Sequence, residues 1–148
     1  MTWETAFSIA NLMAGLCWMV LIVLPRGWPV LPAIIRLAVP LLLAIAYSAL
    51  VLAFFFTVDG GFDSIAHVRT LFQSDPVLLA GWLHYLAFDL LIGAWIADKA
   101  DQDRISRLIQ APILFATFMF GPLGWLLFQA VSLGQHLLVA PAAQGVRS

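Results

Sequence analysis

Long stretches without charged side chains restrict what this chain can fold into. The first runs from Thr5 to Leu24, and three more follow, one of which contains a single aspartate. A helix needs about 20 apolar residues to cross roughly 30 Å of hydrocarbon. We therefore predict four transmembrane helices, over residues 5–24, 37–57, 77–97 and 108–133.

The composition also favours a membrane protein. Of the 148 residues, 63% are hydrophobic and only 10% are charged, which leaves too little polar surface to cover a water-soluble globule of this size. We predict an all-α fold, a polytopic membrane protein whose four transmembrane helices form one bundle. The bundle is expected to be a single domain over residues 1–140, followed by a flexible tail over residues 141–148.

The segment between the second and third spans, residues 57–76, is too short and too charged to cross the bilayer. Asp63 is a predicted helix N-cap, and the residues after it place apolar side chains at helical spacing. These apolar residues are Ile65, Val68 and Phe72. We predict a short interfacial helix here, lying against the lipid headgroups.

Proline and glycine mark two further breaks in the pattern. The connection after the first span contains three prolines, which end a helix because they lack a backbone N–H. The last span is interrupted near its middle, where we predict a kink in an otherwise continuous helix. The residues concerned are Pro25, Pro29 and Pro32 in the connection, and Gly121, Pro122 and Gly124 in the last span.

Lysine and arginine are distributed unevenly between the two predicted sides of the membrane. The first and third connections hold Arg26, Arg36, Lys99, Arg104 and Arg107, whereas the opposite side holds only Arg69 and the distant Arg147. The positive-inside rule therefore places these two connections in the cytoplasm and both chain termini outside. The bias is moderate, so the inverted arrangement stays open.

The third span contains two ionisable side chains, His84 and Asp89. A carboxyl group at bilayer depth costs on the order of 2.5–3.5 kcal/mol on insertion scales, so we expect Asp89 to face the bundle interior. The two residues lie about 140° apart around a helix, with Tyr85 in the arc between them. We predict that His84, Tyr85 and Asp89 line one pocket as catalytic proton donors and acceptors on an apolar ligand.

A structural interpretation of the same residues stays open. Asp89 and His84 would then hydrogen-bond across helices to Asn11, Gln110 or backbone carbonyls, as polar side chains in membrane bundles often do. Under the functional interpretation, Asn11, Gln110 and Trp82 are candidate substrate-binding residues. An ionisable residue at membrane depth favours function by default, and the two interpretations are evenly balanced for Asp89.

Several classes of function are disfavoured. A net charge of -1 provides no basic field for a nucleic-acid partner. No GxSxG, HExxH, CxxC or P-loop motif is present, and the single cysteine, Cys17, has no mate for a disulfide. Asp98, Asp101 and Asp103 form a cluster, but its spacing matches no strong metal signature, and Asp103 is four residues from both Lys99 and Arg107, as in ion pairs along an exposed helix. We therefore predict neither a metal site nor a cofactor.

Two segments carry a resemblance to a known family. GWLHYLAFDLLIGAWIADKA (residues 81–100) and APILFATFMFGPLGWLLF (residues 111–128) resemble the abscisic-acid-deficient-four-like family, small multi-span membrane proteins whose plant members are required to make neoxanthin from violaxanthin. WxHYLAFDL and FGPLG together are the specific pieces, and HVRTLF (residues 67–72) extends the match loosely upstream. The first half of the chain matches only in its pattern of spans.

The resemblance implies a carotenoid or another isoprenoid ligand. For plant members it implies an isomerisation that opens an epoxide into an allenic alcohol, which requires an acid at the epoxide oxygen and a base at a neighbouring C–H. His84 and Asp89 lie within the matching motif. We take Asp89 as the acid by hypothesis, because an apolar environment favours a protonated carboxyl group.

The first span follows the start of the chain closely, which leaves no room for a plastid transit peptide. We therefore expect a bacterial, multi-pass protein of the inner membrane, whose substrate differs from that of plant members because most bacteria make no neoxanthin. The alternative is a non-catalytic membrane protein that binds pigment or lipid, forms homo-oligomers or holds a carotenoid-pathway enzyme. A small transporter is a third option and would require dimerisation.

Overall fold

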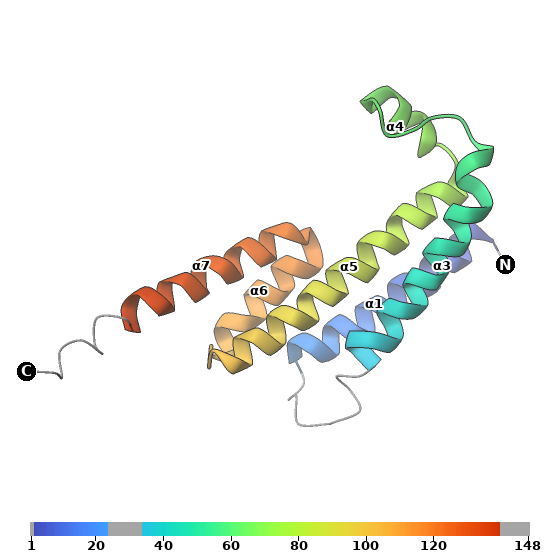
Figure 1. The fold of residues 1–148 in the computed structure, drawn as a ribbon. Coiled ribbons are helices and arrows are strands. Elements are labelled where there is room, and N and C mark those ends of the chain that lie inside the picture. The colour runs from blue at the N-terminus through green and yellow to red at the C-terminus, as the bar shows by residue number, and fades with distance from the viewer. Residues whose placement is uncertain (1, 24–33, 140–148) are drawn as a thin grey trace, which may run out of the picture.

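The computed structural model describes residues 2–23 and 34–139, and every regular element in these ranges is helical. The elements are α1 (Trp3–Val23), the π-helical turn η1 (Ile34–Ala38), α3 (Val39–Phe54), the 3-10 turn η2 (Phe55–Thr57), α4 (Ile65–Leu71), α5 (Asp75–Gln102), α6 (Arg107–Phe120) and α7 (Pro122–Val139) (Figure 1). The proline-rich connection and the tail predicted over residues 141–148 lie outside the described residues.

Three helical segments are long and apolar enough to cross a membrane, and they confirm the first three predicted spans as helices. They are α1 with 21 residues, the continuous stretch Ile34–Thr57 with 24 residues, and α5 with 28 residues. α5 extends past the predicted end at residue 97, because the charged run that begins at Asp98 continues the helix to Gln102. The helices therefore have the length and composition that membrane-spanning helices require.

α5 is the central helix of the fold, because α1, α3, α6 and α7 all pack against it. α1 runs parallel to α5 and α3 runs antiparallel to both (Figure 1). Gly93 leaves room for the indole ring of Trp18 from α1, which is only 2% exposed. Leu90 and Ile96 of α5 are completely buried, so the longest helix also supplies the centre of the core.

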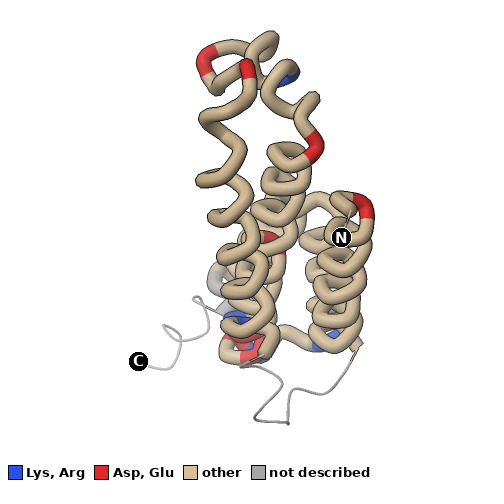
Figure 2. Tube along the Cα trace, turned by 90° about the vertical axis from the view of Figure 1, so that its right-hand side faces the viewer, with Lys and Arg blue, Asp and Glu red and all other residues tan. Residues whose placement is uncertain are grey.

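Polar contacts join four helices at one end of the bundle. Arg36 before α3 forms an ion pair with Asp98 of α5, and the Arg107 guanidinium of α6 donates to the Ile22 carbonyl near the end of α1, at 3.5 Å. Most charged residues lie near the two ends of the bundle (Figure 2). Each exposed pair contributes at most about 1 kcal/mol, so these contacts align helix ends while apolar packing supplies most of the stability.

The segment predicted as a fourth span is divided in two, and the prediction of a continuous kinked helix was wrong. α6 ends at Gly121, whose φ of 45° lies in the left-handed region that favours glycine, and Pro122 begins α7. α7 then folds back along α6 (Figure 1), and Leu108 near the start of α6 and Val131 of α7 line the same groove.

The length of α6 and its close contact with α7 argue against a fourth crossing by one continuous helix. α6 has 14 residues, or about 21 Å at 1.5 Å per residue, which is short of the roughly 30 Å hydrocarbon core. Gly124 packs against Thr117, so the two helices are in close contact from the turn onward. The four-span count is therefore not confirmed, and the residues form a helical hairpin, α6–α7.

A short helix is present where one was predicted between the second and third spans. Its N-cap is Ser64, whose hydroxyl accepts the His67 backbone N–H at 3.1 Å, and not Asp63 as predicted. The Asp63 carboxylate instead bonds the His67 ring at 2.8 Å, and this hydrogen bond holds the pKa of Asp63 below its ordinary value. The position of α4 at a membrane interface stays a prediction.

We expect the α6–α7 hairpin to enter and leave the membrane on the same side. With Cys17→Ala removing the native thiol, single cysteines at Gln135 in α7, Gln102 at the end of α5 and Asp59 in the α3–α4 connection would be labelled with a membrane-impermeant maleimide. Gln135→Cys should react from the same side as Gln102→Cys, because the hairpin returns the chain to its starting side.

Gln102→Cys and Asp59→Cys serve as references for the two sides, since α5 lies between them in the chain. Reaction of Gln135→Cys from the side of Asp59→Cys would instead establish a fourth crossing.

Candidate functional site

Asp89 lies at the middle of α5, 14 residues after Asp75 and 13 before Gln102. Its side chain is only 9% exposed and faces the turn of the α6–α7 hairpin. The approach is so close that a Cβ atom at Gly121 would lie 2.5 Å from one carboxyl oxygen. The hairpin turn therefore covers the carboxyl group at the middle of α5.

The Asp89 carboxyl group is not fully paired. Its Oδ2 atom is buried and has no hydrogen-bond partner among the described residues. A buried polar atom without a partner costs about 1–3 kcal/mol, so a proton or a ligand atom that bonds this oxygen would be stabilising. The arrangement is suited to binding or protonating an oxygen of a ligand.

A cavity of about 250 Å³ lies beside the carboxyl group. We call it the Asp89 cavity, and its other walls are Ile92, Gly121, Pro122 and Trp125. These walls are almost wholly apolar, and Asp89 is the single ionisable residue among them. The site therefore offers one acid or base group to an apolar ligand.

Tyr85 lies one helical turn before Asp89, and the two side chains interact. Its hydroxyl shares its proton between the backbone carbonyls of Phe118 and Met119, at 3.3 and 3.2 Å. These carbonyls belong to the last turn of α6, where the helix itself provides no partners. Tyr85 therefore fastens the end of α6 to α5 and holds the hairpin turn against Asp89.

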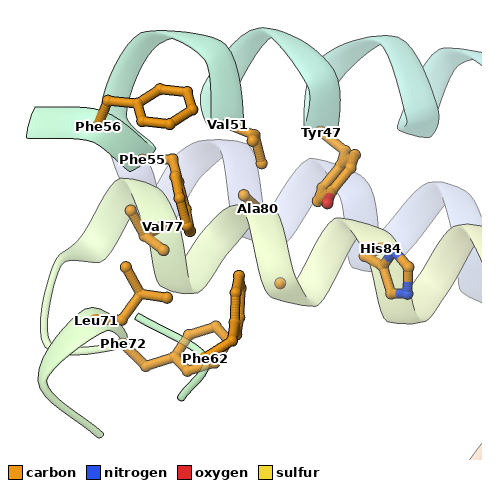
Figure 3. Close-up of a pocket in the computed structure, with 11 residues that line it drawn as sticks. Tyr47, Val51, Phe55, Phe56, Phe62, Leu71, Phe72, Val77, Ala80 and His84 are labelled. Atoms are coloured by element: carbon orange, nitrogen blue, oxygen red, sulfur yellow. The ribbon is translucent and has the colours of Figure 1, made fainter. Parts of the chain in front are cut away.

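His84 faces a different part of the structure. Its ring contacts Tyr47 of α3, with ring centroids 5.4 Å apart, and Phe88 of α5, with centroids 4.5 Å apart. It lines a second cavity of about 480 Å³ between α3, α4 and the start of α5 (Figure 3). The structure thus brings Tyr85 and Asp89 together but places His84 in another cavity, and the role of His84 as a base stays a prediction.

The three candidate substrate-binding residues hold elements together. The Trp82 indole N–H donates to the Asn11 amide oxygen at 2.8 Å, which joins α5 to α1. The Gln110 amide is 1% exposed and donates to Asp101 and to the Ile105 carbonyl, both at 2.8 Å. None of the three lines the Asp89 cavity. Their roles in ligand binding stay predictions.

Sequence reasoning did not single out Ile92 and Trp125, which form walls of the Asp89 cavity. Trp125 directly follows the FGPLG segment, and only the reversal of the chain at Gly121 brings it beside α5. Ile92 lies one turn after Phe88 on a helix that is apolar along most of its length, so the sequence carried no signal that distinguished it.

Substitution of Gly121 by alanine should destabilise the protein by about 2 kcal/mol or more. The new methyl group meets the Asp89 carboxyl, and a positive φ is unfavourable for alanine. The free energy of unfolding can be measured by denaturant titration in mixed micelles.

Gly134→Ala is the matched control, because this α7 glycine has nothing within 4 Å of an added Cβ. Adding Asp89→Ala to Gly121→Ala should recover the steric part of the loss, as a double-mutant cycle would reveal. Equal unfolding free energies for the two glycine variants would contradict the close contact between Gly121 and Asp89.

A protein-family model matches most of the described residues. The model of the ABA DEFICIENT 4-like family matches residues 5–128, a range that contains α5, α6 and the hairpin turn. Neither curated proteins nor solved structures gave a match. The family match confirms the resemblance seen in the WxHYLAFDL and FGPLG segments, and the chain belongs to the ABA DEFICIENT 4-like family.

Proposed function

We propose that this protein is an intramembrane isomerase of a carotenoid or another isoprenoid lipid, with Asp89 as its catalytic acid. The observation that carries the proposal is the buried, unpartnered Oδ2 atom of Asp89 beside an apolar cavity. An ionisable group at membrane depth favours a functional role. Membership of the ABA DEFICIENT 4-like family agrees with an apolar substrate.

The chemistry of one carboxyl group is sufficient for the isomerisation of an epoxide. Protonated Asp89 donates its proton to the epoxide oxygen, and a C–O bond breaks to leave a cation that the adjoining conjugated chain delocalises. The Asp89 carboxylate then removes a proton from the neighbouring carbon, and the released electron pair forms the new C=C bond of an allene. Substrate and product have the same mass, and the carboxyl group is restored.

The surroundings of Asp89 support this sequence of steps. Apolar walls exclude water, which would otherwise add to the cation. Tyr85 is a positioning residue, because its bonds to Phe118 and Met119 hold the hairpin turn in place and so fix the wall that faces the carboxyl group. Since the same carboxyl donates and later accepts a proton, this route requires no second ionisable residue in the cavity.

A non-catalytic role in binding pigment or lipid is the second candidate. It is favoured by the separation of His84 from Asp89, which leaves Asp89 as the single ionisable residue lining its cavity. In this case the carboxyl would anchor a ligand oxygen without changing the ligand. The same experiment separates the two functions.

We also propose a multi-pass arrangement in a bacterial inner membrane. The end of the bundle that carries Arg36, Lys99 and Arg107 would lie in the cytoplasm under the positive-inside rule. The three long helices would cross, and the α6–α7 hairpin would reach to the depth of Asp89 and return. This arrangement replaces the predicted outside position of the C-terminus with a cytoplasmic one.

Replacement of Asp89 by asparagine should abolish the isomerisation. The protein would be coexpressed with a carotenoid pathway that supplies epoxide-bearing carotenoids, and pigments would be compared by mass and retention time. We expect a product of unchanged mass with the wild type and at least about a 100-fold lower rate with Asp89→Asn, because an amide cannot donate and recover the proton.

Asp59→Asn, in the exposed α3–α4 connection, makes the same chemical change away from the site and should leave conversion intact. Full conversion by Asp89→Asn would rule out the proposed acid. Pigment that copurifies unconverted with the wild type would support the binding function.

A further inference from the structure

Two cavities open along the same helix, α5, on the part of its surface that α1 does not cover. One is the Asp89 cavity, and the other is the larger cavity beside His84, which we call the aromatic groove. We propose that the aromatic groove binds the ring end of one elongated, apolar lipid, whose chain lies along α5 and reaches the Asp89 cavity. The reaction at Asp89 rests on the proposed function, whereas ligand binding in the aromatic groove does not depend on it.

The walls of the aromatic groove favour a flat, apolar ring. Four of its lining residues are the phenylalanines Phe55, Phe56, Phe62 and Phe72. Phe55 and Phe62 stack with ring centroids 5.5 Å apart and planes at 17°. The Phe72 ring lies so close to Gly81 that an added Cβ would be 2.6 Å from it. Figure 3 shows these side chains around the groove. Aromatic faces of this kind pack well against another ring.

A row of side chains joins the aromatic groove to the Asp89 cavity. His84, Phe88 and Ile92 follow one another at intervals of four residues and therefore lie along one face of α5. His84 lines the groove and Ile92 lines the Asp89 cavity. Phe88 lies between them, stacks against His84 and is 55% exposed. A ligand could therefore lie over Phe88 and occupy both cavities.

The length and charge of this path select the class of ligand. From Val77 in the groove to Ile92 the helix advances by about 22 Å at 1.5 Å per residue, which requires a long, extended molecule. Neither cavity is lined by lysine or arginine, so a phospholipid headgroup would find no cationic partner. An elongated lipid with a ring at its end and no charge, such as a ring-ended polyene, fits both features.

Binding can be measured directly with two carotenoid probes. The purified protein in lipid nanodiscs would be titrated with zeaxanthin, which has rings at both ends, and with lycopene, which has none, and quenching of tryptophan fluorescence would be recorded. Phe88→Ala should weaken zeaxanthin binding about tenfold, because it removes an aromatic contact from the middle of the path. The matched control is Phe115→Ala on α6, where the ring is 56% exposed and lines neither cavity.

The ring preference is tested at the outer end of the groove. Phe62→Ala, at a residue that is 71% exposed, should weaken zeaxanthin binding about tenfold and leave lycopene binding unchanged. Because Phe62, Phe88 and Phe115 all have exposed side chains, the three variants are expected to fold, and circular dichroism would establish that they do.

The inference would be overturned if Phe88→Ala and Phe115→Ala bound zeaxanthin equally well, or if Phe62→Ala weakened both probes to the same extent. The two proposals can fail separately, because Phe88→Ala reports on binding along the groove and Asp89→Asn reports on the reaction. Groove-dependent binding together with full conversion by Asp89→Asn would refute the proposed function and leave the binding site standing. Loss of conversion in Asp89→Asn, with no effect of Phe88→Ala on binding, would support the proposed function and refute the proposed binding site.

Discussion

The contact between the Asp89 carboxyl group and the turn at Gly121 determines how the second half of this protein is arranged. A carboxyl group in the middle of an apolar helix is costly unless other parts of the protein cover it, and here the turn of the α6–α7 hairpin covers it. Gly121 is required twice, because its φ of 45° allows the reversal and because any side chain there would strike Asp89. The depth of the turn and the position of the candidate site therefore follow from one contact.

α5 connects this contact to the rest of the fold. The other long helices pack around it, and the ion pair between Arg36, just before α3, and Asp98 aligns α3 with α5 at one end. Since α1 covers one side of α5 and the hairpin covers another, the sector that holds Phe88 remains exposed. That sector borders both cavities, so the same packing that stabilises the bundle leaves a path by which an apolar molecule could approach Asp89 from the membrane.

The candidate site was predictable in part. The cost of burying a charge indicated that Asp89 faces the interior, and the helical repeat placed Tyr85 beside it; both are found together. The same repeat placed His84 on a broad common face, but His84 is exposed and its ring contacts Tyr47 of α3, whereas the hairpin covers Asp89. Neighbouring helices divide that face, and nothing in the spacing of residues on one helix reveals where its neighbours lie.

From the sequence alone, the length of the uncharged runs determined three membrane-length helices, because a helix in lipid must satisfy its own backbone and must be about 20 residues long. The short helix α4 could also be predicted from neighbouring residues, since its cap and its apolar spacing lie within a few residues of each other. The direction of the chain after Gly121 was not determined by neighbouring residues in the sequence. A glycine–proline pair permits either a kinked helix or a reversal, and only the packing of α7 against α6 and α5 decided between them.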